Sequence, residues 1–247
     1  MRIIILIIIF FIALPLGLSA QKADKIIKKP LLRNEKSYGV NFNSDGWGFG
    51  FRIGKALTYK NKKTWDFNFS FIGDSKQERQ IREGNQGISK SFYYGKMMFF
   101  YGVQALYGRQ KVIAEKPYWG GVEIRWFYFG GPNLGIGKPI YLYVYNSPTT
   151  YESSLEKYDP QKHLIEDIVG RGPYTKGLNE LSFHPGLSMK IGLSVEFEGF
   201  QEKTKSLEAG IIVDGYAIPV QIMGLSDPDY YHLRLFLAFR FGKRYNK

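Results

Sequence analysis

The chain has 247 residues, a formal net charge of +12, 17% aromatic residues and 28 glycines, and it contains no cysteine. The absence of thiols excludes disulfide frameworks, thiolate metal sites, cysteine nucleophiles and a lipid anchor on an N-terminal cysteine. A basic chain of this kind suits either nucleic acid or anionic lipid head groups as a partner.

The N-terminal segment predicts export. Residues 1-20 have the form of a secretory signal peptide, with Arg2 before an uncharged apolar run and Leu18-Ser19-Ala20 as the cleavage site. The alternative is an uncleaved inner-membrane anchor, although the run is short for about 30 Å of hydrocarbon. Because an exported protein does not meet chromosomal DNA, we expect no nucleic-acid partner.

A basic stretch, residues 21-36, follows the signal and is broken by Pro30. We expect a periplasmic tail with little fixed structure, and we assign residues 37-247 to a single β-barrel domain.

Within that domain, apolar and polar residues alternate with the period of two that is typical of strands. Trp65, Phe67 and Phe69 alternate with polar residues, and the segment near the C-terminus is equally regular. An uncharged apolar face suits lipid, and a face of Gly, Arg, Glu and Tyr suits a narrow barrel interior. A soluble β-sandwich would alternate in the same way, but the export signal and the Tyr and Trp residues near strand ends favour the membrane. The expected strands are 45-58, 64-72, 93-109, 119-130, 133-145, 183-198, 205-217 and 230-241.

The predicted fold is therefore all-β, a single transmembrane antiparallel β-barrel of about eight strands. With both termini in the periplasm, the long loop 146-182 faces outward, and residues 130-133 form a periplasmic turn. The loop 73-92 does not fit, because strand parity makes this long connection periplasmic. A hairpin at Asp45-Gly46, with an extra strand at 37-43, would place the 73-92 loop on the outer side instead. The extra strand makes the number of strands odd, so we keep the prediction of eight strands.

The inward faces predict a closed lumen. Eight strands leave an interior that side chains just fill, and buried charges require partners. Equal numbers of inward acids and bases therefore predict a charge network rather than a channel. The expected members are Arg52, Asp66, Glu123, Arg125, Lys190, Glu196, Glu208, Asp214, Arg234 and Arg240.

Nothing in the sequence predicts catalysis, a metal or a cofactor. The histidines His163, His184 and His232 are scattered, without a spaced carboxylate partner. We interpret His184 and His232 as hydrogen-bonded structural residues. Gly46, Gly48 and Gly50 alternate along a strand, where they make room for bulky neighbours in the lumen.

Two surface sites are predicted. The turn containing Lys60, Lys62 and Lys63 lies at the outer surface by strand parity, where it contacts lipopolysaccharide phosphates or is simply solvated.

The second site is in the long loop, where Asp159 and Pro160 predict the start of a short helix over 160-169. Its apolar stripe packs on the barrel rim or docks on a larger partner. The residues expected at this contact are Tyr158, Leu164, Ile165, Ile168 and Tyr174.

Four segments carry a family resemblance. The segments 46-52 (GWGFGFR), 116-123 (KPYWGGVE), 156-160 (EKYDP) and 241-245 (FGKRY) together resemble a family of small outer-membrane β-barrel proteins from Bacteroidota. The resemblance implies an outer-membrane location and no catalytic residues. Barrels of this size in that phylum are similar to accessory subunits of envelope machines for type IX secretion or outer-membrane protein assembly.

The expected function is thus that of a non-catalytic accessory subunit of such a complex, in contact with outer-membrane lipid and lipopolysaccharide. A stand-alone barrel for lipid binding or adhesion is the alternative, followed by a lipid-modifying enzyme.

Overall fold

The structure is a computed structural model that describes residues 33–74, 77, 79–80, 83–84, 87–88, 91–115, 121–145, 153–198, 203–224 and 226–246. The predicted signal peptide, and the predicted tail up to residue 32, lie outside the described residues. Within the described part, no helix is long and apolar enough to cross a membrane.

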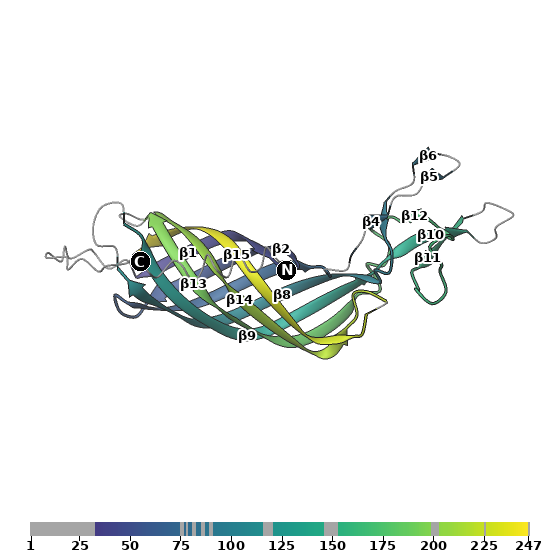
Figure 1. Ribbon diagram of the computed structural model, residues 1–247. Coiled ribbons are helices and arrows are strands. Elements are labelled where there is room, and N and C mark those ends of the chain that lie inside the picture. Colours follow the sequence, from purple (N-terminus) through teal and green to yellow (C-terminus); the bar gives the residue numbers. More distant parts are fainter. Residues whose placement is uncertain are drawn as a thin grey trace, which may run out of the picture.

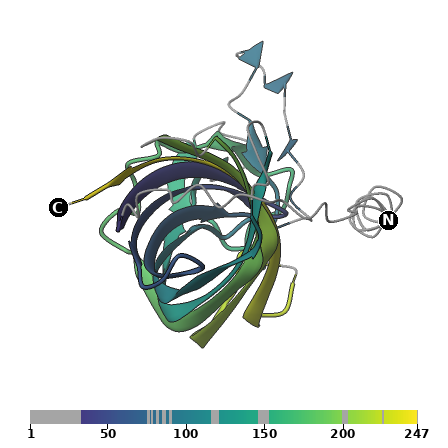
Figure 2. The ribbon, with the colours of Figure 1, turned by 90° about the vertical axis from the view of Figure 1, so that its left-hand side faces the viewer.

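Eight antiparallel strands close into a barrel (Figures 1 and 2). The first strand pairs with the last as well as with the second, so the barrel has no free edge. The all-β barrel of eight strands predicted from the sequence is confirmed. In spatial order the strands are β1 (Asn34–Asn43), β15 (Asp229–Tyr245), β14 (Lys203–Val220), β13 (Ser182–Glu198), β9 (Glu123–Pro139), β8 (Met98–Ala114), β3 (Asn61–Ile72) and β2 (Gly46–Ala56).

The outer wall of the barrel is apolar. On β15, every second residue from Tyr231 to Phe241 is apolar or aromatic and exposed. At about 3.3 Å per residue and a tilt of about 40°, this stretch covers about 25 Å along the barrel axis. That height matches the apolar band of a membrane barrel. Aromatic rings also lie near both rims, with Trp47 stacked on Phe71 at one and Trp65 against Tyr107 at the other.

The predicted number of eight strands is right because two errors cancel: one strand was left out and another was counted as two. The segment that was rejected as a strand is β1, which turns at Ser44-Asp45 into β2. The two predicted strands 119-130 and 133-145 are mainly one strand, β9, which runs through the supposed turn. Pro132 is tolerated there because the β8–β9 pairing is interrupted beside it, between Gln104↔Asn133 and Tyr107↔Gly130.

This topology assigns the connections to the two ends of the barrel. Asn34 pairs with Tyr245, so both ends of the barrel sequence lie at one rim, which we call the terminal rim. The β2–β3 turn, residues 57-60, lies at the same rim, so the prediction that it lies at the opposite surface is wrong. β3 ends and β8 begins at the other rim, which we call the loop rim, and so do the end of β9 and the start of β13. The long 73-92 segment therefore joins strands on the same side as the other long connection, and it no longer conflicts with strand parity.

At the loop rim the long connections form a small structure of their own (Figure 1). β10 (Tyr141–Tyr145) pairs with β11 (Ser153–Lys157) and β12 (Ile168–Arg171), and short hairpins join β4 (Arg79–Gln80) to β7 (Phe92–Tyr93) and β5 (Glu83–Gly84) to β6 (Gly87–Ile88). We call residues 91–97, 140–145 and 153–181 the loop module. Its core contains Phe92, Ile140, Leu142, Val144, Tyr158 and Ile168.

The predicted helix over 160-169 is wrong. Asp159 accepts a hydrogen bond from the Gln161 amide, as a cap would, but only turns follow. The chain then enters β12, in which Ile168 pairs with Val144. The predicted stripe is split as a result: Ile168 is fully buried in the module core, whereas Leu164 is 63% exposed.

Candidate functional site

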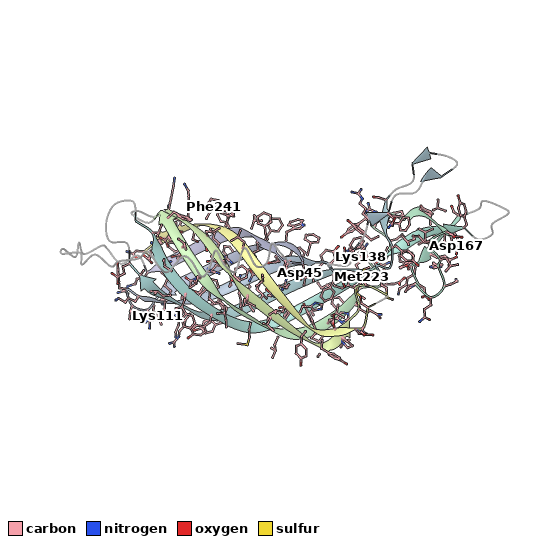
Figure 3. The ribbon with its side chains drawn as sticks, in the orientation of Figure 1. Asp45, Lys111, Lys138, Asp167, Met223 and Phe241 are labelled. Atoms are coloured by element: carbon pink, nitrogen blue, oxygen red, sulfur yellow. The ribbon has the colours of Figure 1, made fainter. Side chains whose placement is uncertain are left out.

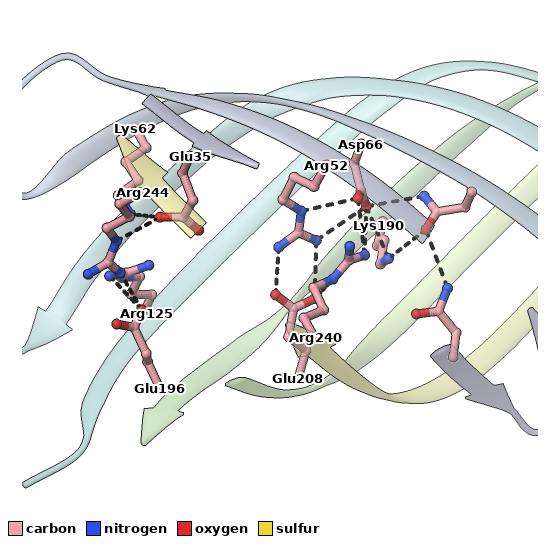
Figure 4. Close-up of polar contacts among 12 residues, drawn as sticks. Glu35, Arg52, Lys62, Asp66, Arg125, Lys190, Glu196, Glu208, Arg240 and Arg244 are labelled. Carbon is pink, nitrogen blue, oxygen red and sulfur yellow. Dashed lines mark hydrogen bonds and ion pairs between the residues drawn. The ribbon is translucent and has the colours of Figure 1, made fainter. Parts of the chain in front are cut away.

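Charged side chains fill the middle of the lumen. Asp66 accepts hydrogen bonds from Arg52 Nε at 3.1 Å, Lys190 Nζ at 3.1 Å and Arg240 at 3.0 Å. Glu208 bonds the same two arginines, Arg52 at 2.5 Å and Arg240 Nε at 2.7 Å (Figure 4). All five side chains are buried. They tie β2, β3, β13, β14 and β15 together across the barrel.

A second charge cluster closes the lumen near the terminal rim. Glu35 pairs with Lys62 and, at 3.0 Å, with Arg244. Glu196 in turn pairs with Arg244 at 2.5 Å and with Arg125 at 2.8 Å (Figure 4). These contacts link the beginning and the end of the barrel sequence to β3, β9 and β13.

A third polar cluster lies toward the loop rim. Arg234 pairs with Asp214, whose other oxygen accepts bonds from Gln104 at 2.7 Å and Asn133 at 3.0 Å. Asn133 also donates to the Tyr216 hydroxyl at 3.0 Å. Each oxygen of the carboxylate therefore has a protein partner.

Apolar side chains pack between the charged clusters. Phe127 and Phe129 stack with ring centroids 5.1 Å apart, and the Arg52 guanidinium lies 4.9 Å from the Phe129 ring. Lys190 lies 4.6 Å from the Phe236 ring. Toward the loop rim, a further group packs across the opening and contains Ile72, Phe100, Tyr216, Val220 and Ile222. Polar and apolar layers thus occupy the lumen along its length.

Glycine makes room for the central cluster, as the sequence indicates. A Cβ on Gly50 would lie 2.7 Å from Asn68 Oδ1 and 3.1 Å from an Arg240 guanidinium nitrogen. The missing side chain is what lets the Arg240 guanidinium lie against the β2 wall.

All three histidines have structural neighbours. His163 Nε2 lies 3.3 Å from Glu156 Oε2, so the expectation that no histidine has a carboxylate partner is wrong for His163. His184 Nε2 lies 3.1 Å from Ser182 Oγ, while its Nδ1 faces the Ile218 carbonyl at 3.2 Å. This Ser–His contact lacks the carboxylate that orients a catalytic histidine. His232 packs against Phe100 and Tyr216. Its buried Nε2 has no hydrogen-bond partner among the described residues, so the prediction that it is hydrogen-bonded is wrong for this atom. No group of three or more potential metal ligands occurs among the residues the structure describes.

The predicted lumen residues all occupy inward positions, and all take part in ion pairs. Glu123, which has the most exposed side chain of the ten, pairs with Arg125 Nε at 2.5 Å. Sequence reasoning missed Glu35 because β1 was not counted, Lys62 because β3 was predicted to begin at 64 instead of 61, and Arg244 because the last strand was ended at 241. The continued alternation through 34-43 and 240-244 is the signal that would have found them.

The predicted lipopolysaccharide-contact residues separate. Lys62 points into the lumen and is bound to Glu35, whereas Lys60 pairs with Glu115 at 3.2 Å and Lys63 is exposed on the outer wall. They do not form one surface, and they lie at the terminal rim.

The loop module has a polar network and an exposed apolar surface. Hydrogen bonds from Lys162, Ser154 and His163 lower the pKa of Glu156 to about 2. Burial lowers the pKa of Lys96, which donates to Gln77 at the base of the module, to about 8. The exposed apolar residues are Tyr143, Leu164, Ile165, Tyr174 and Leu178.

No protein-family model matches the chain, and no curated protein matches it. Among solved structures, it is similar to Ail, the attachment invasion locus protein of Yersinia pestis, in complex with the heparin analogue sucrose octasulfate. That match has 11% identity and a TM-score of 0.42, over 87% of this chain and all of Ail. It is also similar to Neisserial surface protein A, with 7% identity and a TM-score of 0.38, over 86% of this chain and 95% of that one. Nothing about function follows from likenesses this distant.

Proposed function

We propose that this protein is a non-catalytic, non-conducting barrel of the outer membrane that presents its loop module to a larger envelope complex. The observation that carries the proposal is the combination of a filled lumen with a module at the loop rim that has its own apolar core. A filled lumen serves anchoring rather than transport, and a module with its own core serves recognition.

The outer wall supports the membrane location. Its apolar band has the height of a bilayer core and is bordered by aromatic residues at both rims. The lengths of the connections support the proposed orientation, since outer-membrane barrels have short periplasmic turns and longer external loops. The terminal rim therefore faces the periplasm, and the loop module faces outward.

The exposed side chains of the loop module support the proposal that it binds a protein partner. Leu164 and Leu178 are 63% and 48% exposed on turns that lie beyond the membrane band. Apolar side chains exposed to water beyond the membrane band are available for contact with a protein partner. An accessory role in type IX secretion or outer-membrane protein assembly agrees with the family resemblance, and adhesion is the second candidate for the same surface.

The filled lumen predicts no conductance. Pure protein in planar bilayers should give no stable channel openings, because buried ion pairs and aromatic layers occupy the interior. Large, uniform openings from the pure wild-type protein would rule out the anchoring role.

The docking role predicts a selective loss of partners. Replacing Leu164 and Leu178 together with Asp should reduce copurification of the partner complex from solubilised outer membranes by tenfold or more, as roughly 2 kcal/mol of apolar contact is lost at each position. Folding should be unchanged, as judged by heat-modifiable mobility on gels.

The control replaces Leu187 and Leu233, which are more exposed, at 71% each, but lie on the lipid-facing wall, with Ala. It should leave copurification unchanged. An intact complex with the Asp variant would refute docking through this surface, and lost adhesion to cells without any lost protein partner would favour the second candidate.

A further inference from the structure

The two rims of the barrel differ in charge. Toward the loop rim, outward residues on the shorter strands are aromatic, such as Phe42 and Trp47, which stacks on Phe71. Toward the terminal rim, the outward faces of six strands carry cations. We call six of these residues, one from each strand, the basic collar: Lys36, Lys55, Lys63, Arg109, Lys203 and Lys243. β8 and β14 each carry a second outward cation, Lys111 and Lys205.

The collar places like charges directly opposite one another. Lys55 pairs in register with Lys63, and Lys63 with Arg109. Lys243 is in register with both Lys36 and Lys203. Cross-strand pairs of like charge destabilise a sheet. Within the described residues no carboxylate pairs with Lys55, Lys63 or Arg109, so none of those residues offsets the repulsion among these three.

The collar lies immediately beyond the apolar band. Lys63 follows Trp65 on one face, Arg109 follows Tyr107, and Lys243 follows Phe241. Figure 3 shows this end of the barrel, where Lys111 and Phe241 are labelled. In a bilayer, positions that border the apolar band and its aromatic residues meet the head groups.

We propose that the basic collar binds the phosphate groups of anionic phospholipids in the leaflet at the terminal rim. The inference rests on the membrane location proposed above. A lipid head-group layer fits better than a protein, because the collar runs around six of the eight strands at the level where the apolar band ends. A protein partner would contact one side.

The test uses the full chain inserted into vesicles of phosphatidylcholine with added brominated phosphatidylglycerol or, separately, brominated phosphatidylcholine. Quenching of tryptophan fluorescence reports which lipid is enriched, since Trp65 is exposed two residues from Lys63. The wild type should prefer phosphatidylglycerol about fivefold, as expected if each lipid contacts one basic residue at about 1 kcal/mol. The preference should fall in 1 M salt, where the Debye length is about 3 Å.

Replacing Lys55, Lys63 and Arg109 with Gln should reduce this preference, because only three of the six collar residues then remain. The control replaces three lysines of the loop module, Lys157, Lys162 and Lys176, with Gln, and it should keep the preference. Equal quenching of the wild type by both lipids, or an undiminished preference in the collar variant, would overturn the inference while leaving the membrane location intact. Failure to insert into either vesicle would overturn the proposed location and the collar together.

Discussion

Replacing Asp66 with Asn is expected to destabilise the barrel by about 3–5 kcal/mol. Asp66 is fully buried and accepts bonds from Arg52, Lys190 and Arg240. Its neutralisation leaves these three buried cations with Glu208 as the carboxylate partner in the central cluster. Unfolding in urea, followed by tryptophan fluorescence in lipid vesicles, measures the loss.

A second substitution separates charge from packing. Lys190→Met added to Asp66→Asn restores the original charge balance of the central cluster, so the double variant should recover part of the lost stability. Simple addition of the two single effects, with no recovery, would show that Asp66 stabilises the barrel in some other way than by balancing these charges.

Replacing Ile168 with Asp is expected to unfold the loop module and leave the barrel folded. Ile168 is fully buried in the module core, on a strand that pairs with β10 and not with the barrel. The loss of a large apolar contact together with burial of a charge costs about 3 kcal/mol or more. Proteolysis within residues 140–181 should then become on the order of a hundredfold faster.

Heat-modifiable mobility of the barrel should not change in this variant. Leu164→Asp, four residues away and 63% exposed, is the matched control and should leave proteolysis at the wild-type rate. Collapse of the barrel along with the module would show that the two do not fold separately.

The alternation of residues predicted most of the barrel, because one face meets lipid and the other meets a narrow lumen. Both constraints act on every residue of β3, β13 and β15, so the pattern there is nearly unbroken. It was less informative in β9, where Gly130, Gly131 and Pro132 have the composition of a turn. Only the pairing with neighbouring strands shows that this segment stays extended.

The lumen charges were predictable as inward residues but not as specific pairs. Arg52 and Glu208 are separated by 156 positions and meet because β2 and β14 face each other across the interior. The loop module was the least predictable part. Asp159 and Pro160 give a local helix signal, but the pairing of Ile168 with Val144 draws the following segment into a sheet.

The central claim is that the barrel spans the outer membrane with its loop module outside, and cysteine labelling tests it directly. The chain has no cysteine, so Leu164→Cys in the module and Thr58→Cys in the β2–β3 turn each create a single reactive thiol. On intact cells, a membrane-impermeant maleimide should label Leu164→Cys and should label Thr58→Cys only after the outer membrane is permeabilised. Labelling of Thr58→Cys on intact cells, with Leu164→Cys protected, would contradict the account.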